Sequence, residues 1–188
     1  TEGTYPLPEA QIDRFMMKVV VGYPSEEEEF VIVERVIGEA PQVAPVLGSD
    51  ELLALQQSCR RSFVEPSLIQ YAVKLVAATR APAQYGLAEL APQIAFGASP
   101  RASIHLIEGA RALALLRGRD YVLPEDVTEL VPDVLRHRLV LSYQALAEGT
   151  TADALIGRLL QRIRPPAAPL APRGGAYAPA AAGGVPLQ

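Results

Sequence analysis

The stretch GASPRAS at residues 97–103 opens the most regular predicted helix of this 188-residue chain. Ser99 suits the N-cap and Pro100 suits the first helical position, which places Arg101 in the first turn. A cation is unfavourable there, because the start of a helix already carries partial positive charge. An anion such as a phosphate chain, bound by free backbone N–H groups and the guanidinium together, would remove this conflict. The alternative is a surface Arg101 paired with an acid such as Glu108.

A second arginine, Arg14, stands just before an apolar, β-rich run at residues 15–21. This run predicts a strand covered on both faces, of the kind found in parallel sheets. Because its backbone groups need neighbouring strands and no comparable run follows, we expect the rest of its sheet to precede this chain. An arginine at the edge of such a sheet can reach a γ-phosphate in a neighbouring subunit and offset the charge of the transition state. The alternative is an Asp13–Arg14 ion pair that fixes the loop.

The pattern after Pro24 is helical. A capping box, with Ser25 as the cap and Glu28 three residues later, begins the first helix. Helices are expected over residues 25–37, 49–62, 66–79, 99–118, 124–142 and 150–163, with a long loop at residues 80–97. From residue 165 the composition turns to Pro, Ala and Gly, which predicts a disordered tail.

The composition, with 49% hydrophobic and 20% charged residues, is typical of a soluble globular protein. No apolar run is long enough to span a membrane and no signal-peptide pattern is present, so we expect a cytoplasmic location. The single cysteine, Cys59, fits a reducing compartment. A net charge of -4 without a basic stripe argues against nucleic acid as a partner.

The two histidines predict no metal site, because His105 and His137 share no ligand spacing. His105 lies one helical turn after Arg101 on the same face, where it could line a nucleotide pocket. A partly buried packing histidine is the favoured interpretation. Ser99 has no matching base nearby, so a nucleophilic triad is unsupported.

Several linked motifs carry a resemblance to a known family. They read EGTYPLPEAQIDRF at 2–15, GYPSEEE at 22–28, GASPRA at 97–102, LRGRDYVLPEDV at 116–127 and VPDVLRHRLVLSY at 131–143. In this order and spacing they resemble the MoxR family of AAA+ ATPases over roughly residues 2–164. Several linked motifs are far more specific than any one of them alone.

The resemblance implies a mainly α fold: the helical lid of an AAA+ P-loop NTPase, with one strand left over from the α/β ATPase core. Residues 1–24 would end that core, 25–164 would form the lid, and 165–188 the disordered tail. Arg14 corresponds to an arginine finger acting in trans, and Arg101 to the sensor-2 arginine that contacts phosphate in its own subunit. Weaker ATP-binding candidates lie beside Arg101: Ser99, Pro100, Ala102 and His105.

The resemblance also implies partners and cofactors. Family members use ATP and Mg²⁺, form rings that are expected to be hexameric, and act as chaperone-like factors that mature or activate client proteins. They often work beside partners that carry a von Willebrand factor A domain. These are expectations for the intact protein, in which the core would hold most of the nucleotide.

The chain departs from the family pattern in ways that matter for activity. It contains no G-x-x-x-x-G-K-[ST] phosphate-binding loop and no apolar strand ending in Asp-Glu. We therefore expect a fragment that does not hydrolyse ATP alone. Leu123 stands where a Thr or Ser cap would suit the helix starting at Pro124.

Two other functions stay open. The chain could be a helical protein-interaction module without ATPase activity of its own, docking on a partner ring. It could also be part of a nucleic-acid motor, since related ring ATPases act on DNA. The acidic balance counts against this second alternative, and salt-dependent DNA binding would revive it.

Overall fold

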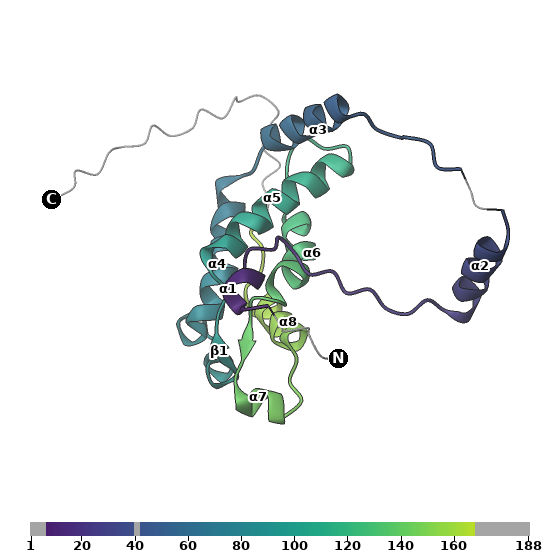
Figure 1. Ribbon diagram of the computed structural model, residues 1–188. Coiled ribbons are helices and arrows are strands. Elements are labelled where there is room, and N and C mark those ends of the chain that lie inside the picture. The colour runs from purple at the N-terminus through teal and green to yellow at the C-terminus, as the bar shows by residue number, and fades with distance from the viewer. Residues whose placement is uncertain (1–6, 40–41, 168–188) are drawn as a thin grey trace.

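A computed structural model describes residues 7–39 and 42–167. The described chain is mainly helical, which confirms the predicted fold class (Figure 1). Its elements in order are α1 (Glu9–Ile12), α2 (Glu26–Ile37), α3 (Ser49–Arg61), α4 (Pro66–Arg80), η1 (Pro82–Tyr85), η2 (Ala88–Gln93), β1 (Ile94–Phe96), α5 (Pro100–Leu116), α6 (Pro124–Leu135), β2 (Val140–Leu141), α7 (Tyr143–Ala147) and α8 (Ala152–Arg162).

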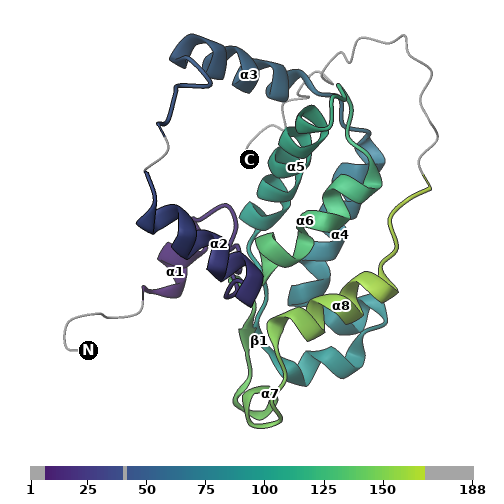
Figure 2. The same cartoon turned by 90° about the vertical axis from the view of Figure 1, so that its right-hand side faces the viewer.

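The hydrophobic core lies between α4, α5, α6 and α8, which pack side by side (Figures 1 and 2). Helix α5 contributes one residue per turn to it, and all four side chains are fully buried: Ala102, Leu106, Ala110 and Ala114. Three of these four residues are alanines, so the neighbouring helices can approach α5 closely. Helix α4 faces this stripe with larger side chains, among them the fully buried Leu75 and Val76.

A short antiparallel pair, β1 with β2, joins the segment before α5 to the segment after α6. The sequence predicted neither strand. It predicted one helix over 124–142, but α6 ends at Leu135, and Val140 pairs with Phe96 instead of continuing the helix. The correction has a physical reason, because a short apolar run fits a helix or a strand and the tertiary partner decides between them.

Helix α2 lies apart from this bundle in Figure 1 and has no buried residue. Its predicted capping box is confirmed: Ser25 Oγ accepts the Glu28 amide, and the Glu28 carboxylate accepts the Ser25 amide. Helix α3 differs slightly from prediction, since its N-cap is Gly48 rather than Ser49. The Gly48 amide donates to the Glu51 carboxylate at 2.8 Å.

The strand predicted over residues 15–21 is not formed. The segment has no regular secondary structure from Met17 onward, and Val21 is 88% exposed. From Met17 to Val21 only the Lys18 amide finds a backbone acceptor, the Asp133 carbonyl at 2.8 Å. An apolar run becomes a strand only when neighbouring strands supply its hydrogen-bond partners, and the described residues supply none.

Two further predictions concern the ends of the chain. The disordered tail over 165–188 lies outside the described residues apart from 165–167, as does the stretch before Leu7. Within the described ranges, no helix is both long enough and apolar enough to cross a membrane.

Candidate functional site

The carboxylate of Asp13, at the end of α1, joins three separate parts of the chain. Ser99 Oγ donates to both of its oxygens, at 3.0 and 2.8 Å. Arg101 Nη1 lies 3.2 Å from Oδ2, and Arg138 Nε lies 3.1 Å from Oδ1. The start of α5 and the turn after α6 are therefore both tied to the segment that carries Arg14.

This environment decides the protonation of Asp13. Burial alone would raise the pKa of the carboxyl group, but the hydrogen bonds from Ser99 and Arg101 and the charge of Arg138 outweigh it. The pKa of Asp13 is therefore held below its ordinary value. The carboxylate is negative at neutral pH, so the cluster of Asp13, Arg101 and Arg138 carries a net positive charge.

Arg101 lies in the first turn of α5, as predicted. Ser99 is the N-cap and accepts the Arg101 amide at 3.2 Å, and Pro100 is the first helical residue. Arg101 does pair with an acid, as the alternative expected, but this acid is Asp13 rather than Glu108. The Arg101 side chain is nevertheless 53% exposed, so most of its donors remain available to a further anion.

Arg14 is exposed and directly follows Asp13. The predicted Asp13–Arg14 pair is not formed, since the Asp13 carboxylate is taken by Ser99, Arg101 and Arg138. In the described part of the chain, the Arg14 side chain has no ion pair or hydrogen bond. Both candidate arginines are therefore close to Asp13: Arg101 is bonded to its carboxylate, and Arg14 is the next residue in the sequence.

Arg138 is the residue that sequence reasoning missed. Its side chain is fully buried and donates to the Asp13 carboxylate and to the carbonyls of Asp13, Phe15, Met16 and Val134. Arg138 Nη2 also lies 2.7 Å from His105 Nδ1. The available signal was the VPDVLRHRLVLSY motif, but nothing in it says that Arg138 rather than Arg136 is buried.

The weaker site candidates surround Arg101. Ala102 is fully buried beneath the first turn of α5, and Pro100 is exposed. His105 is partly buried, and its Nδ1 must accept from Arg138 because a guanidinium has no acceptor. Burial, followed by the charge of Arg138, lowers the pKa of His105. A neutral packing histidine fits this position.

A second polar cluster joins the end of α5 to the start of α6. The buried Asp126 carboxylate accepts from Arg119 at 2.6 and 2.7 Å, from Arg117 at 2.9 Å and from the Leu123 amide at 2.8 Å. In a full capping box, the cap side chain and the side chain three residues later each accept a backbone amide. Here only the second bond forms, from the Leu123 amide to Asp126, because Leu123 has no side-chain acceptor. Burial would raise the pKa of Asp126, but the bond from Arg119 and the others lower it. Its role is structural.

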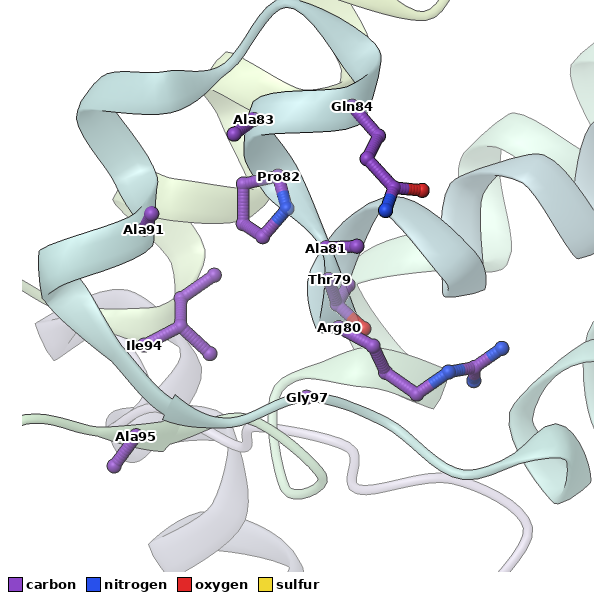
Figure 3. A pocket seen from close by; sticks show the side chains of 10 residues that line it. All are labelled: Thr79, Arg80, Ala81, Pro82, Ala83, Gln84, Ala91, Ile94, Ala95 and Gly97. Atoms are coloured by element: carbon purple, nitrogen blue, oxygen red, sulfur yellow. The ribbon is translucent and has the colours of Figure 1, made fainter.

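An open pocket of about 270 Å³ lies between the end of α4, η1 and β1 (Figure 3). Figure 3 shows the Arg80 side chain extending away from Ala91 and Ile94, and Arg80 Nη1 donates to the Ala98 carbonyl at 2.7 Å. The pocket lining includes none of Asp13, Arg101 or Arg138. Across the described ranges, no group of three or more His, Cys, Asp and Glu side chains is placed to hold a metal ion.

Comparison with known proteins defines the class. Residues 87–159, which run from η2 through α8, match the family model described as the AAA lid domain. The crystal structure of a proposed ATPase from Cytophaga hutchinsonii superposes with a TM-score of 0.83 at 42% identity, covering 87% of this chain and 50% of that one. The described fold is that of the lid part of an AAA+ ATPase.

Two proteins with similar sequences identify the family within this class. The chain is 50% identical to the chaperone MoxR1 of Mycobacterium tuberculosis over 178 residues, which is 95% of this chain and 47% of that protein. It is 36% identical to the protein MoxR of Paracoccus denitrificans, covering 89% of this chain and 53% of that protein. The chain belongs to the MoxR family of AAA+ ATPases, and it spans about half the length of these relatives.

Proposed function

We propose that this chain is the nucleotide-sensing lid of an ATPase that couples ATP hydrolysis to chaperone-like maturation or activation of client proteins. The observation that carries the proposal is the exposed Arg101 guanidinium in the first turn of α5, beside the segment of Arg14. The name of one relative, the chaperone MoxR1 of Mycobacterium tuberculosis, supports the kind of work done. ATP and Mg²⁺ would be held mainly by parts of the protein outside this chain.

Arg101 suits a switchable phosphate contact. Its one carboxylate partner, Asp13, is shared with Ser99 and with the buried Arg138, so Asp13 stays satisfied if Arg101 leaves. Exposed ion pairs contribute only about 0–1 kcal/mol, so exchange of Asp13 for a more highly charged phosphate costs little. The positive end of the α5 helix dipole would add to the binding of that phosphate.

Arg14 is proposed to act on a neighbouring copy of the protein. In the transition state of phosphoryl transfer, negative charge is spread over the oxygens of the transferred phosphoryl group. An added guanidinium offsets that charge. Arg14 is exposed and without a side-chain partner among the described residues, as such a role requires. This implies a ring, expected to be hexameric, with client proteins and a von Willebrand factor A domain protein as candidate partners.

The test uses the intact protein and measures ATP turnover against protein concentration. Specific activity should rise with concentration, and Arg14→Ala should lower kcat by about a thousandfold while each subunit still binds ATP. Arg101→Ala should weaken ATP binding as well as turnover. Normal turnover in Arg14→Ala, together with activity that is independent of concentration, would remove the trans-acting role.

Mixed rings separate the two arginines. Arg14→Ala subunits keep an intact nucleotide site of their own, so mixing them with subunits disabled in ATP binding should restore turnover. Arg101→Ala subunits should not be rescued in this way, because their own site lacks a contact. Rescue of both variants would mean that Arg101 also reads the neighbour's nucleotide.

A second function, a helical interaction module without ATPase activity, is favoured by the exposed apolar side chains of α2. These are Phe30, Val31, Ile32, Val33, Val36 and Ile37. Concentrated exposed apolar surface marks interaction sites. If neither arginine affects turnover in the intact protein, this becomes the better account.

A further inference from the structure

The last two residues of α4, Thr79 and Arg80, hold both backbone groups of Ala98. The Ala98 amide donates to Thr79 Oγ1 at 2.9 Å, and the Thr79 hydroxyl itself donates to the Val76 carbonyl at 2.6 Å. Arg80 Nη1 donates to the Ala98 carbonyl at 2.7 Å. Two consecutive side chains at the end of one helix therefore fix a residue that lies in the turn before another helix, α5.

The main chain of this turn also approaches α4 closely, where Figure 3 shows Gly97 beside Thr79 and Arg80. A Cβ at Gly97 would lie 2.4 Å from the Thr79 carbonyl oxygen, so any larger residue would force the two segments apart. Thr79 and Ala98 are each only 1% exposed. Because water cannot replace a lost partner at a buried site, removing the acceptor of the Ala98 amide is costly.

The attachment positions the start of α5. Ser99 is the N-cap and Pro100 the first helical residue, so Arg101 follows the held Ala98 by only three residues. Proline fixes its own φ and restricts the residue before it, so few dihedral angles are free between Ala98 and Arg101. Ala102, the next residue, is fully buried in the core. The backbone of Arg101 is thus held by α4 on one side and by the core on the other.

Arg80 contributes to this attachment without being a packing residue. It is exposed, and within the described ranges its side chain makes one hydrogen bond, to the Ala98 carbonyl, and no ion pair. A cation at the last residue of α4 is favourable whatever its side chain contacts, because the end of a helix carries partial negative charge. The bond to Ala98 is therefore the specific contact through which Arg80 acts on the turn.

We infer that Thr79 and Arg80 are positioning residues for Arg101: they hold residues 97–99 so that the Arg101 guanidinium is already in place when the nucleotide binds. This inference rests on the proposed function for the role of Arg101. The attachment of the turn stands by itself on the contacts of Thr79, Arg80 and Ala98. A group that is held in place beforehand binds more tightly, because less ordering accompanies binding.

Amide hydrogen exchange in the intact protein tests the attachment. Thr79→Val keeps the shape of the side chain but removes the acceptor of the Ala98 amide, so exchange at that amide should rise about tenfold or more. Thr79→Ser keeps a hydroxyl and should exchange as wild type does. Exchange in α6 should stay at the wild-type rate in both variants, which shows that the core is folded. Unchanged exchange at Ala98 in a folded Thr79→Val protein overturns the inference.

Binding of AMP-PNP with Mg²⁺ to the intact protein tests the positioning role. Arg101→Ala should raise the Kd about tenfold or more, as loss of a charged hydrogen bond does. Thr79→Val and the exposed variant Arg80→Met should each raise it about threefold to tenfold, because the contact of Arg101 is then misplaced. In an Arg101→Ala background neither should cause a further rise, since residues that act as one unit are not additive. An equal rise in both backgrounds overturns the positioning role.

Lys74→Met is the matched control for Arg80→Met, because Lys74 is an exposed cation of the same helix. It should leave the Kd at the wild-type value, and a rise equal to that of Arg80→Met would mean that Arg80 acts only through its charge. If Arg101→Ala alone leaves the Kd unchanged, the nucleotide-sensing role fails and the positioning role fails with it. A raised Kd in Arg101→Ala together with a wild-type Kd in both α4 variants overturns the positioning role alone.

Discussion

At the scale of single residues, ion pairs between distant parts of the chain hold the start of α5 and the turn after α6 to Asp13. The first-turn position of Arg101 follows from Ser99 and Pro100, and the structure has this helix start. Its partner Asp13 lies 88 residues away in sequence, and Arg138 lies 125 residues from Asp13. No local pattern encodes such pairs, because they form only when the helices pack. Burial of Arg138 had no sequence signal for the same reason.

Asp126 offers a test of a buried carboxylate in a structural role. Asp126→Asn removes the negative charge that Arg117, Arg119 and the Leu123 amide share, and leaves these donors poorly satisfied. Breaking one partner of a buried charged network costs about 3 kcal/mol of unfolding free energy. Chemical denaturation measures this loss.

The matched control for this change is Glu125→Gln, one residue earlier and exposed in the same helical turn. It removes the same charge but no buried bond, so its effect should stay within about 0.5 kcal/mol. Equal effects of the two substitutions would mean that Asp126 stabilises the protein only because its negative charge lies at the positive end of the α6 dipole.

At the scale of elements, the sequence predicted the longer helices well and the short elements poorly. The predicted starts at Pro66, Pro100 and Pro124 agree with α4, α5 and α6, since proline at a first helical position is a strong local signal. The sequence analysis predicted none of the 3-10 turns, β1, β2 or α7, because these short elements depend on tertiary contacts. The run at residues 15–21 failed as a strand because its propensity needs neighbours that the described residues lack.

Gly97 is the element-scale position at which packing requires a glycine. A Cβ there would lie 2.4 Å from the Thr79 carbonyl oxygen and 2.7 Å from the Arg80 amide nitrogen, both backbone atoms at the end of α4. Gly97→Ala should therefore force β1 and α4 apart and cost about 1–3 kcal/mol of unfolding free energy. Thermal or chemical denaturation measures it.

Gly157 in α8 is the control for this substitution, because a Cβ there meets nothing within 4 Å. Gly157→Ala should stabilise the protein by about 0.5–1 kcal/mol, since alanine favours a helix interior. A Gly97→Ala protein as stable as wild type would show that the contact between α4 and the β1 segment is looser than described.

At the scale of the whole molecule, stability should fall on acidification from pH 7.5 to 5.5. Burial lowers the pKa of His105 and of His137 below 6.5. The charges of Arg138 and Arg101 add to this shift at His105, where Glu108 and Asp13 oppose it. The charges of Arg138 and Lys18 add to it at His137, where the hydrogen bond to the Phe15 carbonyl and the charge of Asp13 oppose it. The unfolded chain then binds more protons just below pH 6.5, so the unfolding free energy decreases there as the pH falls. The lowered pKa of Asp13 and Asp126 adds a loss of the same sign below about pH 4.

Denaturant midpoints across this range measure the effect, and a His105→Gln, His137→Gln double variant serves as the control. The double variant should lose less stability than wild type between pH 7.5 and 5.5, because it lacks the two partly buried groups that take up protons on unfolding. A wild-type midpoint that is constant or rises towards pH 5.5 would contradict the prediction.

Residues 19–24, which make no backbone hydrogen bond within the described part of the chain, also set a length scale for α2. The seven Cα–Cα steps from Lys18 to the cap Ser25 span at most about 25 Å, so the start of α2 stays within about that radius of Lys18, whose amide donates to the Asp133 carbonyl. A helix on so short a linker is presented to a nearby surface at an effective concentration in the millimolar range. A contact of its exposed apolar side chains that is too weak to form between separate molecules would then be largely occupied. Such a contact could be released and remade while the helix stays close to the same surface.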